Sequence, residues 1–381
     1  MKILGLILEL NPPHNGHKYF IDEAKRLTNA SIVVCVLTSS FTMRGEISVI
    51  DKYTKAKLAL DMGVDFVFDY PTGLAMQSSD IFAINAIDIL ANLGITDIAF
   101  GVENDDLNAL IKIKDLYSSL AFNSLLKANM DKGYSYSLAH YNALNEMGVS
   151  EGVINMSQSS NNILAISYLK ALDNYPNIKI TLVKRIENSY HDIELNTTFI
   201  SSATAVRHAI DEGQSIENQV IDCSYPYIKQ VDANERIFDL LKYVYAVKPL
   251  DYLKTIAGVS EGIEIRIKNF LDRPNYTEFI NSVKTKRYSI NHINRIIVNM
   301  ILDNHGKITD SNYYRLVGFN PSKRKFLSNL KSNISIFSSL KNAPDAYLWQ
   351  LEEKASRIYD VITKMDTISL EYKYPIKKEQ Q

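Results

Sequence analysis

The stretch LILELNPPHNGHKYF, residues 6–20, joins an apolar run to a polar turn that holds two of the seven histidines of the chain. The apolar run Ile3–Leu8 has the length and composition of a buried strand, and the residues from His17 onward have helical spacing. Glu9, two prolines and His14 lie between them. A buried strand that leads through a polar turn into a helix is typical of an α/β fold with a parallel sheet.

The segment His14-Asn15-Gly16-His17 combines groups that favour phosphate binding. In an open parallel sheet, ligands bind beyond the carboxyl ends of the strands, where the first amides of the helices point outward. Gly16 lets a ligand approach the backbone, and the histidine spacing puts both imidazoles on one side of the first helical turn. Two such donors can stabilise the charge that builds up on phosphate during a displacement, without a covalent intermediate.

Two other interpretations of these histidines are open. They can be surface residues without a role, or a His-x-x-His pair can hold a metal ion. A metal site needs a further ligand nearby, and Glu9 alone is a weak candidate. We therefore expect a phosphate site and no metal site made of protein side chains.

The composition is that of an ordinary globular protein. The chain has 381 residues, of which 46% are hydrophobic and 22% charged, and its net charge is −1. No run reaches the roughly 18 apolar residues of a membrane helix, and the apolar start is too short for one. It also lacks a signal peptide's cleavage site. The two cysteines, Cys35 and Cys223, form no disulfide or zinc pattern, so we expect a cytoplasmic protein without a membrane partner.

Short runs rich in β-branched residues alternate with runs of helical spacing through the first half of the chain. This alternation predicts βαβ units with right-handed crossovers. The expected strands are residues 2–8, 31–38, 65–70, 96–101 and 177–185. The expected helices are residues 17–28, 51–63, 79–94, 161–172 and 201–213.

Strand patterns become rare beyond about residue 225. Residues 234–247, 261–271 and 290–303 have helical periodicity, and the tail after Pro375 has the composition of a disordered segment. We therefore expect an α/β domain of nucleotide-binding type over residues 1–225 and a mostly helical domain over residues 226–381.

The near-zero net charge hides a basic region. Residues 284–331 contain ten basic and two acidic side chains, a net charge of +8. A local basic field of this size suits a polyanion, although a solvated helical face is an equally good explanation on charge alone.

Several motifs carry a resemblance to a known family. HNGH resembles the HxGH signature of the nucleotidylyltransferase superfamily, and ISSATAV followed by Arg207 resembles its second motif, which holds the outer phosphates. The whole chain is similar to the bacterial tRNA(Met) cytidine acetate ligase family. The similar segments include ELNPPHNGH, RGEISVIDKYTKAKLAL, QSSDIFA, FGVEN, SSNNILAISYLKAL, VKRIENSYHD, ISSATAVR, EGIEIR, TKRYSINHINRI and YYRLVGFN.

This resemblance implies a two-step reaction. Members of the family activate acetate with ATP to give acetyl-adenylate and pyrophosphate. They then transfer the acetyl group to N4 of the wobble cytidine, C34, of elongator tRNA(Met), which forms N4-acetylcytidine. The resemblance thus implies a ligase with ATP as its cofactor and Mg²⁺ accompanying it, and with His14 and His17 as catalytic residues.

The resemblance also implies which residues contact ATP. His14 and His17 would steady the α-phosphate, and Arg185 can form a bidentate fork with phosphate oxygens. On the residues alone, Gly101 can equally be a strand-ending turn, Asn162 a helix cap in competition with Asn161, and Arg185 a surface residue. The implied ATP-binding residues are Ile7, Leu8, Glu9, Asn11, Pro12, His14, Asn15, Gly16, His17, Lys18, Phe20, Gly101, Asn162, Arg185, Ser202 and Arg207.

Arg44, Asp51 and Lys52 match a further stretch of the family. They are candidates for the wall of the acetate or ATP site, although Asp51 can instead cap the following helix. The sequence departs from the family pattern elsewhere, which leaves the acetate pocket and the tRNA contacts less defined than the phosphate motifs. The departures are Pro13, Ser39, Ser40, Met43, Ile47 and Ile265.

We expect the basic region to bind tRNA, and the α/β domain to form the adenylate without it. Basic residues that alternate with Tyr288 and His292 suit phosphate contact combined with base stacking. The candidate tRNA-binding residues are Lys286, Arg287, Arg295, Lys323, Arg324 and Lys325.

Three alternatives to the ligase explain the sequence less well. An adenylyltransferase acting on a small phosphorylated metabolite needs little beyond the α/β domain, which would leave the basic region without a role. A non-catalytic RNA-binding protein is disfavoured because His14, Gly16, His17 and Arg207 are all present. An aminoacyl-tRNA synthetase is disfavoured because no KMSKS-like loop follows the expected sheet.

Overall fold

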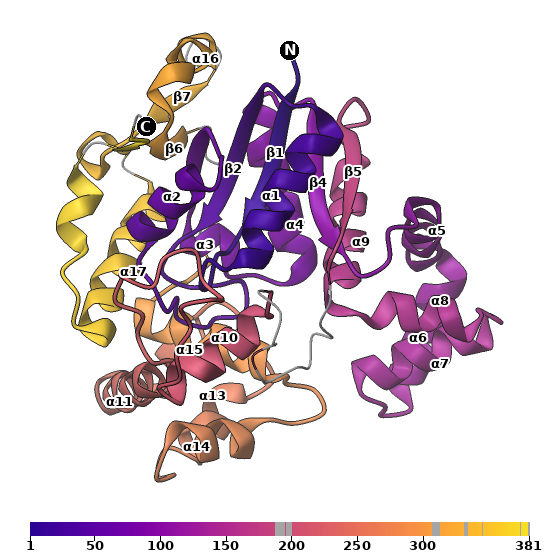
Figure 1. Ribbon diagram of the computed structural model, residues 1–381. Helices are drawn as coiled ribbons and strands as arrows, with labels where there is room; N and C mark the ends of the chain where they lie inside the picture. Colours follow the sequence, from indigo (N-terminus) through magenta and orange to yellow (C-terminus); the bar gives the residue numbers. More distant parts are fainter. Residues whose placement is uncertain are drawn as a thin grey trace.

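Figure 1 shows a computed structural model of the chain. A group of helices lies beyond the carboxyl ends of the parallel strands of an α/β sheet. The structure describes residues 1–186, 195, 200–306, 313–330, 334–344, 346–373 and 375–379.

The first half of the chain forms the predicted alternation of strands and helices, and the α/β fold class is confirmed. The strands are β1 (Ile3–Leu8), β2 (Ile32–Thr38), β3 (Phe66–Tyr70), β4 (Asp97–Val102) and β5 (Lys179–Lys184). The helices among and after them are α1 (Asn15–Thr28), α2 (Lys52–Asp61), α3 (Thr72–Ala75), α4 (Ser79–Asn92), α9 (Ser160–Leu172) and α10 (Ala203–Asp211).

The order of the strands creates a crevice beside β1. The sheet runs β5-β4-β1-β2-β3, all parallel, so the chain leaves β1 toward β2 on one side and reaches β4 on the other. Ligands bind at such a switch point in open α/β sheets. β1 and β4 are paired only at Leu4↔Asp97 and Gly5↔Ile98, near their amino ends. Their carboxyl ends are therefore not joined by ladder hydrogen bonds, which leaves room for a ligand between them.

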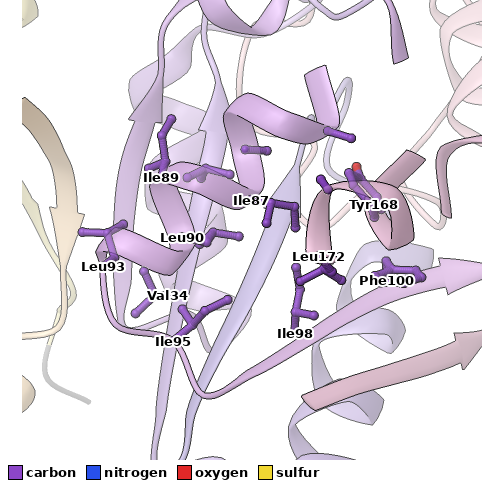
Figure 2. Close-up of a cluster of buried hydrophobic side chains, with 14 of the residues drawn as sticks. Val34, Ile87, Ile89, Leu90, Leu93, Ile95, Ile98, Phe100, Tyr168 and Leu172 are labelled. Carbon is purple, nitrogen blue, oxygen red and sulfur yellow. The ribbon is translucent and has the colours of Figure 1, made fainter. Parts of the chain in front are cut away.

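Two hydrophobic layers cover the sheet. On one face, side chains of β1–β4 pack against α4 and α9, with Val34, Ile87, Leu90 and Leu172 among those that Figure 2 labels. On the other face, Leu4, Leu6 and Val33 pack with residues of α1 and α2. Because β1–β4 are buried on both faces, they have nearly continuous apolar sequences instead of alternating ones.

Four helices between β4 and α9 were not predicted. They lie beside the sheet, at the right of Figure 1, and have a small core of their own around Phe122, Ala143, Leu144 and Ile154. They are α5 (Leu107–Ser118), α6 (Leu120–Asp131), α7 (Tyr136–Glu146) and α8 (Glu151–Gln158).

The region after residue 226 is mostly helical, as predicted, but it also extends the sheet. Strand β6 (Tyr313–Phe319) pairs antiparallel with β3, β7 (Ser335–Phe337) pairs with β6, and β8 (Ile376–Lys377) also pairs with β6. The prediction of a disordered tail after Pro375 is thus wrong for β8. The division of the chain at residue 225 stays a prediction.

The helices of this region form a separate core with Phe41 and Ile47 from the N-terminal half. The helices in this core are α11 (Gln230–Val247), α12 (Leu250–Leu253), α13 (Ile263–Lys268), α14 (Tyr276–Val283), α15 (Ile290–Leu302) and α17 (Tyr347–Thr363). Helix α16 (Arg324–Leu330) instead packs on the sheet, where Phe326 and Leu327 join the core that holds α4 and α9. Short 3₁₀ helices are η1 (Pro321–Lys323), η2 (Leu340–Asn342) and η3 (Ile368–Tyr372). Among the described residues, no helix has the length and apolar character needed to span a membrane.

Candidate active site

A cavity of about 260 Å³ lies beyond the carboxyl ends of β1, β4 and β5. Its walls include the turn after β1, the first turn of α1, the residues that follow β5 and the start of α10. This is the switch point of the sheet, where the sequence predicted the phosphate site.

His14 and His17 hold each other at the start of α1. His14 is the N-cap, and its Nδ1 accepts a hydrogen bond from the Gly16 amide at 3.1 Å. The Nδ1 atom of His17 accepts from the amide of His14 at 3.2 Å, so the pair forms a capping box. A neutral imidazole that accepts at Nδ1 carries its proton at Nε2. Each ring is therefore fixed as an Nε2–H donor, and both rings border the cavity.

Burial keeps both histidines uncharged. It lowers the pKa of His17 to about 3, with a further contribution from Arg185. Burial also lowers the pKa of His14 well below its usual range, and the neighbouring His17, Arg185 and Arg207 act in the same direction. Since neither ring is protonated near neutral pH, the pair can donate hydrogen bonds to a phosphate but cannot supply positive charge.

Gly16 is required by His14 as well as by any ligand. A Cβ atom at this position would lie 2.8 Å from Cε1 and 2.9 Å from Nδ1 of His14. A side chain there would displace the imidazole from its capping position. The sequence analysis explained Gly16 by the close approach of a ligand to the backbone. Both explanations can hold, because Gly16 also lines the cavity.

Arg185 and Asn161 border the cavity on its β4–β5 side. The Nη1 atom of Arg185 donates to Oδ1 of Asn161 at 3.3 Å, and burial lowers the pKa of Arg185. Asn161 is positioned by Glu103, whose Oε1 accepts from its Nδ2 at 2.6 Å. Gly101 also borders the cavity, and a Cβ there would meet only ordinary contacts at 3.8 Å or more. The protein itself does not require a glycine there, and the contact of Gly101 with ATP stays a prediction.

The ISSATAVR segment closes the opposite wall. Ser202 caps α10 by accepting from the amide of Ala205 at 3.1 Å. The Nη1 atom of Arg207 donates to the carbonyl of Asn11 at 2.8 Å, and its Nη2 lies 3.7 Å from the carboxylate of Glu46. Arg207 thus ties the turn after β1 to α10 and brings the two predicted phosphate motifs together.

Most of the predicted ATP-binding residues border this cavity, and four do not. Asn15 faces away, since its Nδ2 donates to the carbonyl of Asn218 at 2.8 Å. Lys18 pairs with Asp22 on the exposed side of α1. Pro12 and Asn162 are also absent from the wall. Those that border the cavity are Ile7, Leu8, Glu9, Asn11, His14, Gly16, His17, Phe20, Gly101, Arg185, Ser202 and Arg207.

Asn162 has a supporting position instead. Its Oδ1 accepts from the amide of Glu103 at 3.1 Å, and its Nδ2 donates to the carbonyl of Met156 at 3.0 Å. The sequence did not identify several cavity residues, since their positions follow from the fold. They include Tyr19, Thr42, Glu46, Phe100, Asn161, Tyr168, Lys184 and Thr204.

Arg44 borders the cavity, but Asp51 and Lys52 do not. Asp51 caps α2, with its Oδ1 accepting from the amides of Tyr53 and Thr54 at 2.9 and 3.0 Å. The capping explanation of Asp51 is thus confirmed.

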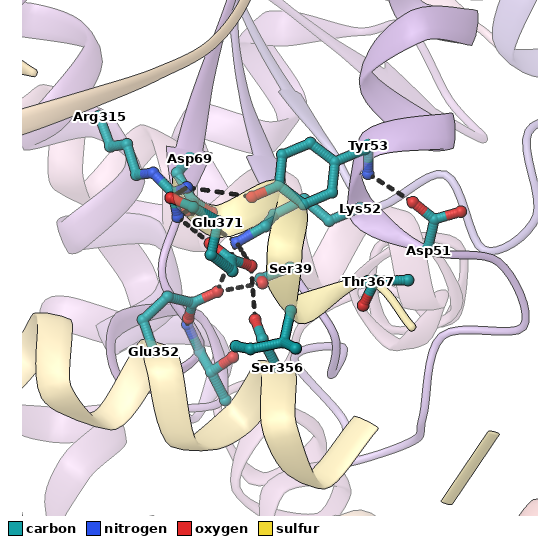
Figure 3. A network of polar contacts seen from close by, with 12 residues as sticks. Ser39, Asp51, Lys52, Tyr53, Asp69, Arg315, Glu352, Ser356, Thr367 and Glu371 are labelled. Carbon is teal, nitrogen blue, oxygen red and sulfur yellow. Dashed lines mark hydrogen bonds and ion pairs between the residues drawn. The ribbon is translucent and has the colours of Figure 1, made fainter. Parts of the chain in front are cut away.

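Lys52 belongs to a buried ion network away from the cavity (Figure 3). We use this name for Lys52, Asp69, Arg315, Glu352 and Glu371, whose side chains are at most 3% exposed. The Nζ atom of Lys52 lies 3.0 Å from Asp69, 2.9 Å from Glu352 and 2.9 Å from Glu371. The network joins α2, β3, β6, α17 and η3.

Burial alone would lower the pKa of Lys52, but the three carboxylates of the buried ion network raise it well above its usual value. Burial raises the pKa of Asp69 to about 6 against the attraction of Lys52. For Glu371 the cations outweigh burial, and its pKa falls to about 2.

The candidate tRNA-binding residues lie in two places. Lys286, Arg287 and Arg295 lie at the turn before α15 and on α15, which is on the carboxyl side of the parallel strands (Figure 1). Lys323–Lys325 follow Asn320, whose amide donates to the carbonyl of Asp65 at the start of β3. They therefore lie on the side of the sheet where the parallel strands begin. Lys307 and Lys331, two other basic residues of this region, lie outside the described residues.

No group of three His, Cys, Asp or Glu side chains in the described parts of the chain could hold a metal ion. The two carboxylates in the cavity wall have other partners. Glu9 accepts from the amide of Met43 at 2.7 Å, and Glu46 pairs with Arg207. Among the described residues, these carboxylates do not build a Mg²⁺ site of their own.

Comparisons with known proteins identify the family of the chain. The HIGH Nucleotidyl Transferase family model matches residues 1–373. A tRNA(Met) cytidine acetate ligase of Oceanobacillus iheyensis is 33% identical, with 94% of each chain covered. One of Caldicellulosiruptor bescii is 34% identical, again with 94% of each chain covered.

Solved structures of Thermotoga maritima TmcAL are also similar. The form bound with alpha-thio ATP has a TM-score of 0.84 at 25% identity, and the apo form has a TM-score of 0.86 at 26% identity. Both matches cover 99% of this chain and 100% of the other. The chain belongs to the HIGH nucleotidyl transferase family and, within it, to the tRNA(Met) cytidine acetate ligases.

Proposed function

We propose that this protein activates acetate with ATP and transfers the acetyl group to N4 of the wobble cytidine of elongator tRNA(Met). In the first step, an acetate oxygen attacks the α-phosphorus, and the bond from that phosphorus to the leaving pyrophosphate breaks. In the second step, the cytidine amine attacks the acetyl carbon and loses a proton, and AMP leaves. A cytoplasmic location, where ATP and tRNA are found, is part of this proposal.

The observation that carries the proposal is the pair of neutral Nε2–H donors at the start of α1, with Arg185 and Arg207 bordering the same cavity. The donors can stabilise the negative charge on the α-phosphate as the acetate oxygen adds. The guanidinium groups can balance the charge of the triphosphate and of the leaving pyrophosphate. Mg²⁺ would enter with the triphosphate, and its part in the reaction is not assigned to any side chain.

The test is acetate-dependent exchange of labelled pyrophosphate into ATP, followed by acetyl transfer to tRNA(Met). We expect exchange with acetate in the absence of tRNA, and labelled N4-acetylcytidine only when tRNA(Met) is added. Exchange that needs a phosphorylated metabolite instead of acetate would support the adenylyltransferase alternative. Binding of tRNA without either activity would support the non-catalytic alternative.

Two groups of basic residues are proposed as tRNA contacts. One lies on the carboxyl side of the parallel strands and the other on the side where these strands begin. Replacing Lys323, Arg324 and Lys325 together by Gln should weaken tRNA binding and flatten its salt dependence. Each lost phosphate contact reduces the slope of log K against log salt by about 0.7 to 0.9. Acetate-dependent exchange should persist, because these residues do not border the cavity.

A charge-matched control is provided by three exposed lysines on or beside α5 and α6. Their replacement by Gln should leave the salt slope unchanged. If the variant with Lys323, Arg324 and Lys325 replaced binds tRNA with the wild-type slope of log K against log salt, these three residues do not contact tRNA. The control residues are Lys112, Lys127 and Lys132.

A further inference from the structure

The hairpin Phe41–Ile47 lies between the cavity and the C-terminal helices. Phe41 and Ile47 pair at its base, the amide of Thr42 donates to the carbonyl of Glu46 at 2.9 Å, and the amide of Gly45 donates to the carbonyl of Thr42 at 3.0 Å. These hydrogen bonds join the two strands of the hairpin from its base to its tip.

The two sides of the hairpin face different surroundings. Phe41 and Ile47 are buried in the core of the C-terminal helices, together with Ile293 and Ile297 of α15. Thr42, Arg44 and Glu46 border the cavity instead. A displacement of α15 would therefore reach the cavity wall through a few residues.

Gly45 at the tip is in direct contact with the backbone of α15. It has a φ of +74°, and a Cβ there would lie 2.5 Å from the amide nitrogen of Arg295 and 2.7 Å from the carbonyl carbon of Asn294. Ordinary contacts begin at 3.4 Å, so the hairpin and the helix would have to separate by about 0.9 Å. Both atoms belong to helix backbone, which cannot turn away as a flexible side chain would.

The hairpin is also joined to the phosphate motifs. Met43 donates its amide to Oε1 of Glu9 at 2.7 Å, and Glu46 lies 3.7 Å from Arg207. On the other side, Asn294 is held by the hydroxyl of Tyr276, which donates to its Oδ1 at 2.8 Å. A continuous chain of contacts thus runs from α14 and α15 to the turn after β1.

We infer that α15, through Gly45, positions Arg44 and Glu46 in the cavity wall, so that adenylate formation depends on the C-terminal helices. This rests on the proposed function of the cavity. It opposes the expectation that the α/β domain forms the adenylate without the helical region. Asn294 and Arg295 act here as positioning residues through their backbone, in addition to any contact of the Arg295 side chain with tRNA.

The test compares Gly45→Ala with Gly94→Ala in the full-length protein. Gly94 has nearly the same φ, +75°, but a Cβ there has no neighbour within 4 Å among the described residues. Both substitutions therefore carry the backbone strain of a left-handed alanine, and only Gly45→Ala displaces a neighbour. Since misplacement by about 1 Å can cost 10²-fold, we expect kcat/KM of acetate-dependent exchange, without tRNA, to fall about 100-fold for Gly45→Ala relative to Gly94→Ala.

The division of this effect between KM and kcat separates positioning from a loss of folded protein. A smaller folded fraction lowers the apparent kcat and leaves KM unchanged, whereas a displaced cavity wall should raise KM for ATP and weaken ATP binding measured by calorimetry. Equal ATP affinity and equal KM in the two variants would overturn the inference. If the wild type binds ATP but shows no acetate-dependent exchange, the proposed function fails, and the affinities still decide the inference.

If Gly45→Ala does not fold, Tyr276→Phe provides the answer. It removes the hydroxyl that holds Asn294 and leaves the ring in the core. We expect Tyr276→Phe to raise KM for ATP, as Gly45→Ala does, but only several-fold. An unchanged KM in folded Tyr276→Phe, with Gly45→Ala unfolded, would count against the inference.

Discussion

The histidine pair His14–His17, in which His14 is buried and His17 half-buried, and the buried ion network are both polar clusters, yet they differ in charge and in surroundings. The histidines are neutral, border a cavity and are fixed by two backbone hydrogen bonds. The network holds two cations and three carboxylates, and none of its members borders the cavity. The pair presents its donors to a cavity, whereas the network satisfies its own charges and joins distant parts of the chain.

This difference separates function from stability. A neutral donor that faces a cavity costs little to bury and can act on a charge that develops in a ligand. A buried charge is tolerated only while its partners remain, so losing one member leaves the others uncompensated. Substitutions in the two clusters should therefore affect different measurements.

The largest expected effect is on stability, for Lys52→Met. Removing the ammonium leaves three buried carboxylates with Arg315 as their remaining cation in the network. Breaking a buried ion pair in this way costs about 3–5 kcal/mol of unfolding free energy. Chemical denaturation should show this loss, with α17 and η3 most exposed to hydrogen exchange because Glu352 and Glu371 attach them.

Lys57→Met is the matched control on the same helix. Lys57 pairs with Asp61 at 3.0 Å, but both side chains are more than one-third exposed, so its loss should cost roughly 0.3–0.5 kcal/mol. Equal stabilities of the two variants would show that the network is not the stabilising element. A loss of exchange activity in stable, folded Lys52→Met would show that the two clusters are not separate.

The next effect is on rate, for His17→Ala. The substitution removes one donor that faces the cavity, and the rate of acetate-dependent exchange should fall by about 10²–10³-fold. Circular dichroism and thermal unfolding should show a folded protein. His208→Ala is the control, because His208 is exposed on α10 and does not border the cavity. Near-normal exchange by folded His17→Ala would remove His17 from the reaction.

The sequence predicted the arrangement of the histidine pair because its residues are close together in the chain. A strand, a turn and the first turn of a helix fix His14, Gly16 and His17 relative to one another. It did not predict the network, because Lys52 and Glu352 are 300 residues apart and Arg315 and Asp69 are 246 apart. The match of Lys52 to a family stretch showed resemblance and gave no information on contacts.

Two smaller differences between the sequence predictions and the structure also arise because the fold, and not the local sequence, decides the contacts. Asn161 and Asn162 are adjacent at the start of α9, and successive helix residues point about 100° apart, so only the fold decides which one faces the cavity. Strand β6 was missed because its partner β3 precedes it by some 250 residues. A strand that pairs at such a distance has no turn signal beside it in the sequence.

The last expected effect concerns pH and is spread over several pH units. The folded-state pKa of His17 is about 3 against an ordinary value of 6.5, so between these values the unfolded chain binds a proton that the folded chain does not. Stability should therefore fall as pH decreases from 6.5 toward 3, by about 1.4 kcal/mol per pH unit for one proton. The pKa of Asp69 is about 6 in the folded chain against an ordinary value of 3.8, so between these values the folded chain holds a proton that the unfolded chain does not. The contribution of Asp69 to stability therefore falls as pH rises through this range.

Comparing the wild type with His17→Gln isolates the contribution of the histidine, because Asp69 is common to both. The unfolding free energy of the variant should have a smaller slope against pH between 4 and 6.5, the difference approaching that of one proton. In the wild type, the rate of exchange should show no step near pH 6.5, because His14 and His17 stay neutral donors across this range. A His17 resonance that titrates near 6.5 in the folded protein would contradict this, and would mean that the imidazole meets the phosphate as a cation.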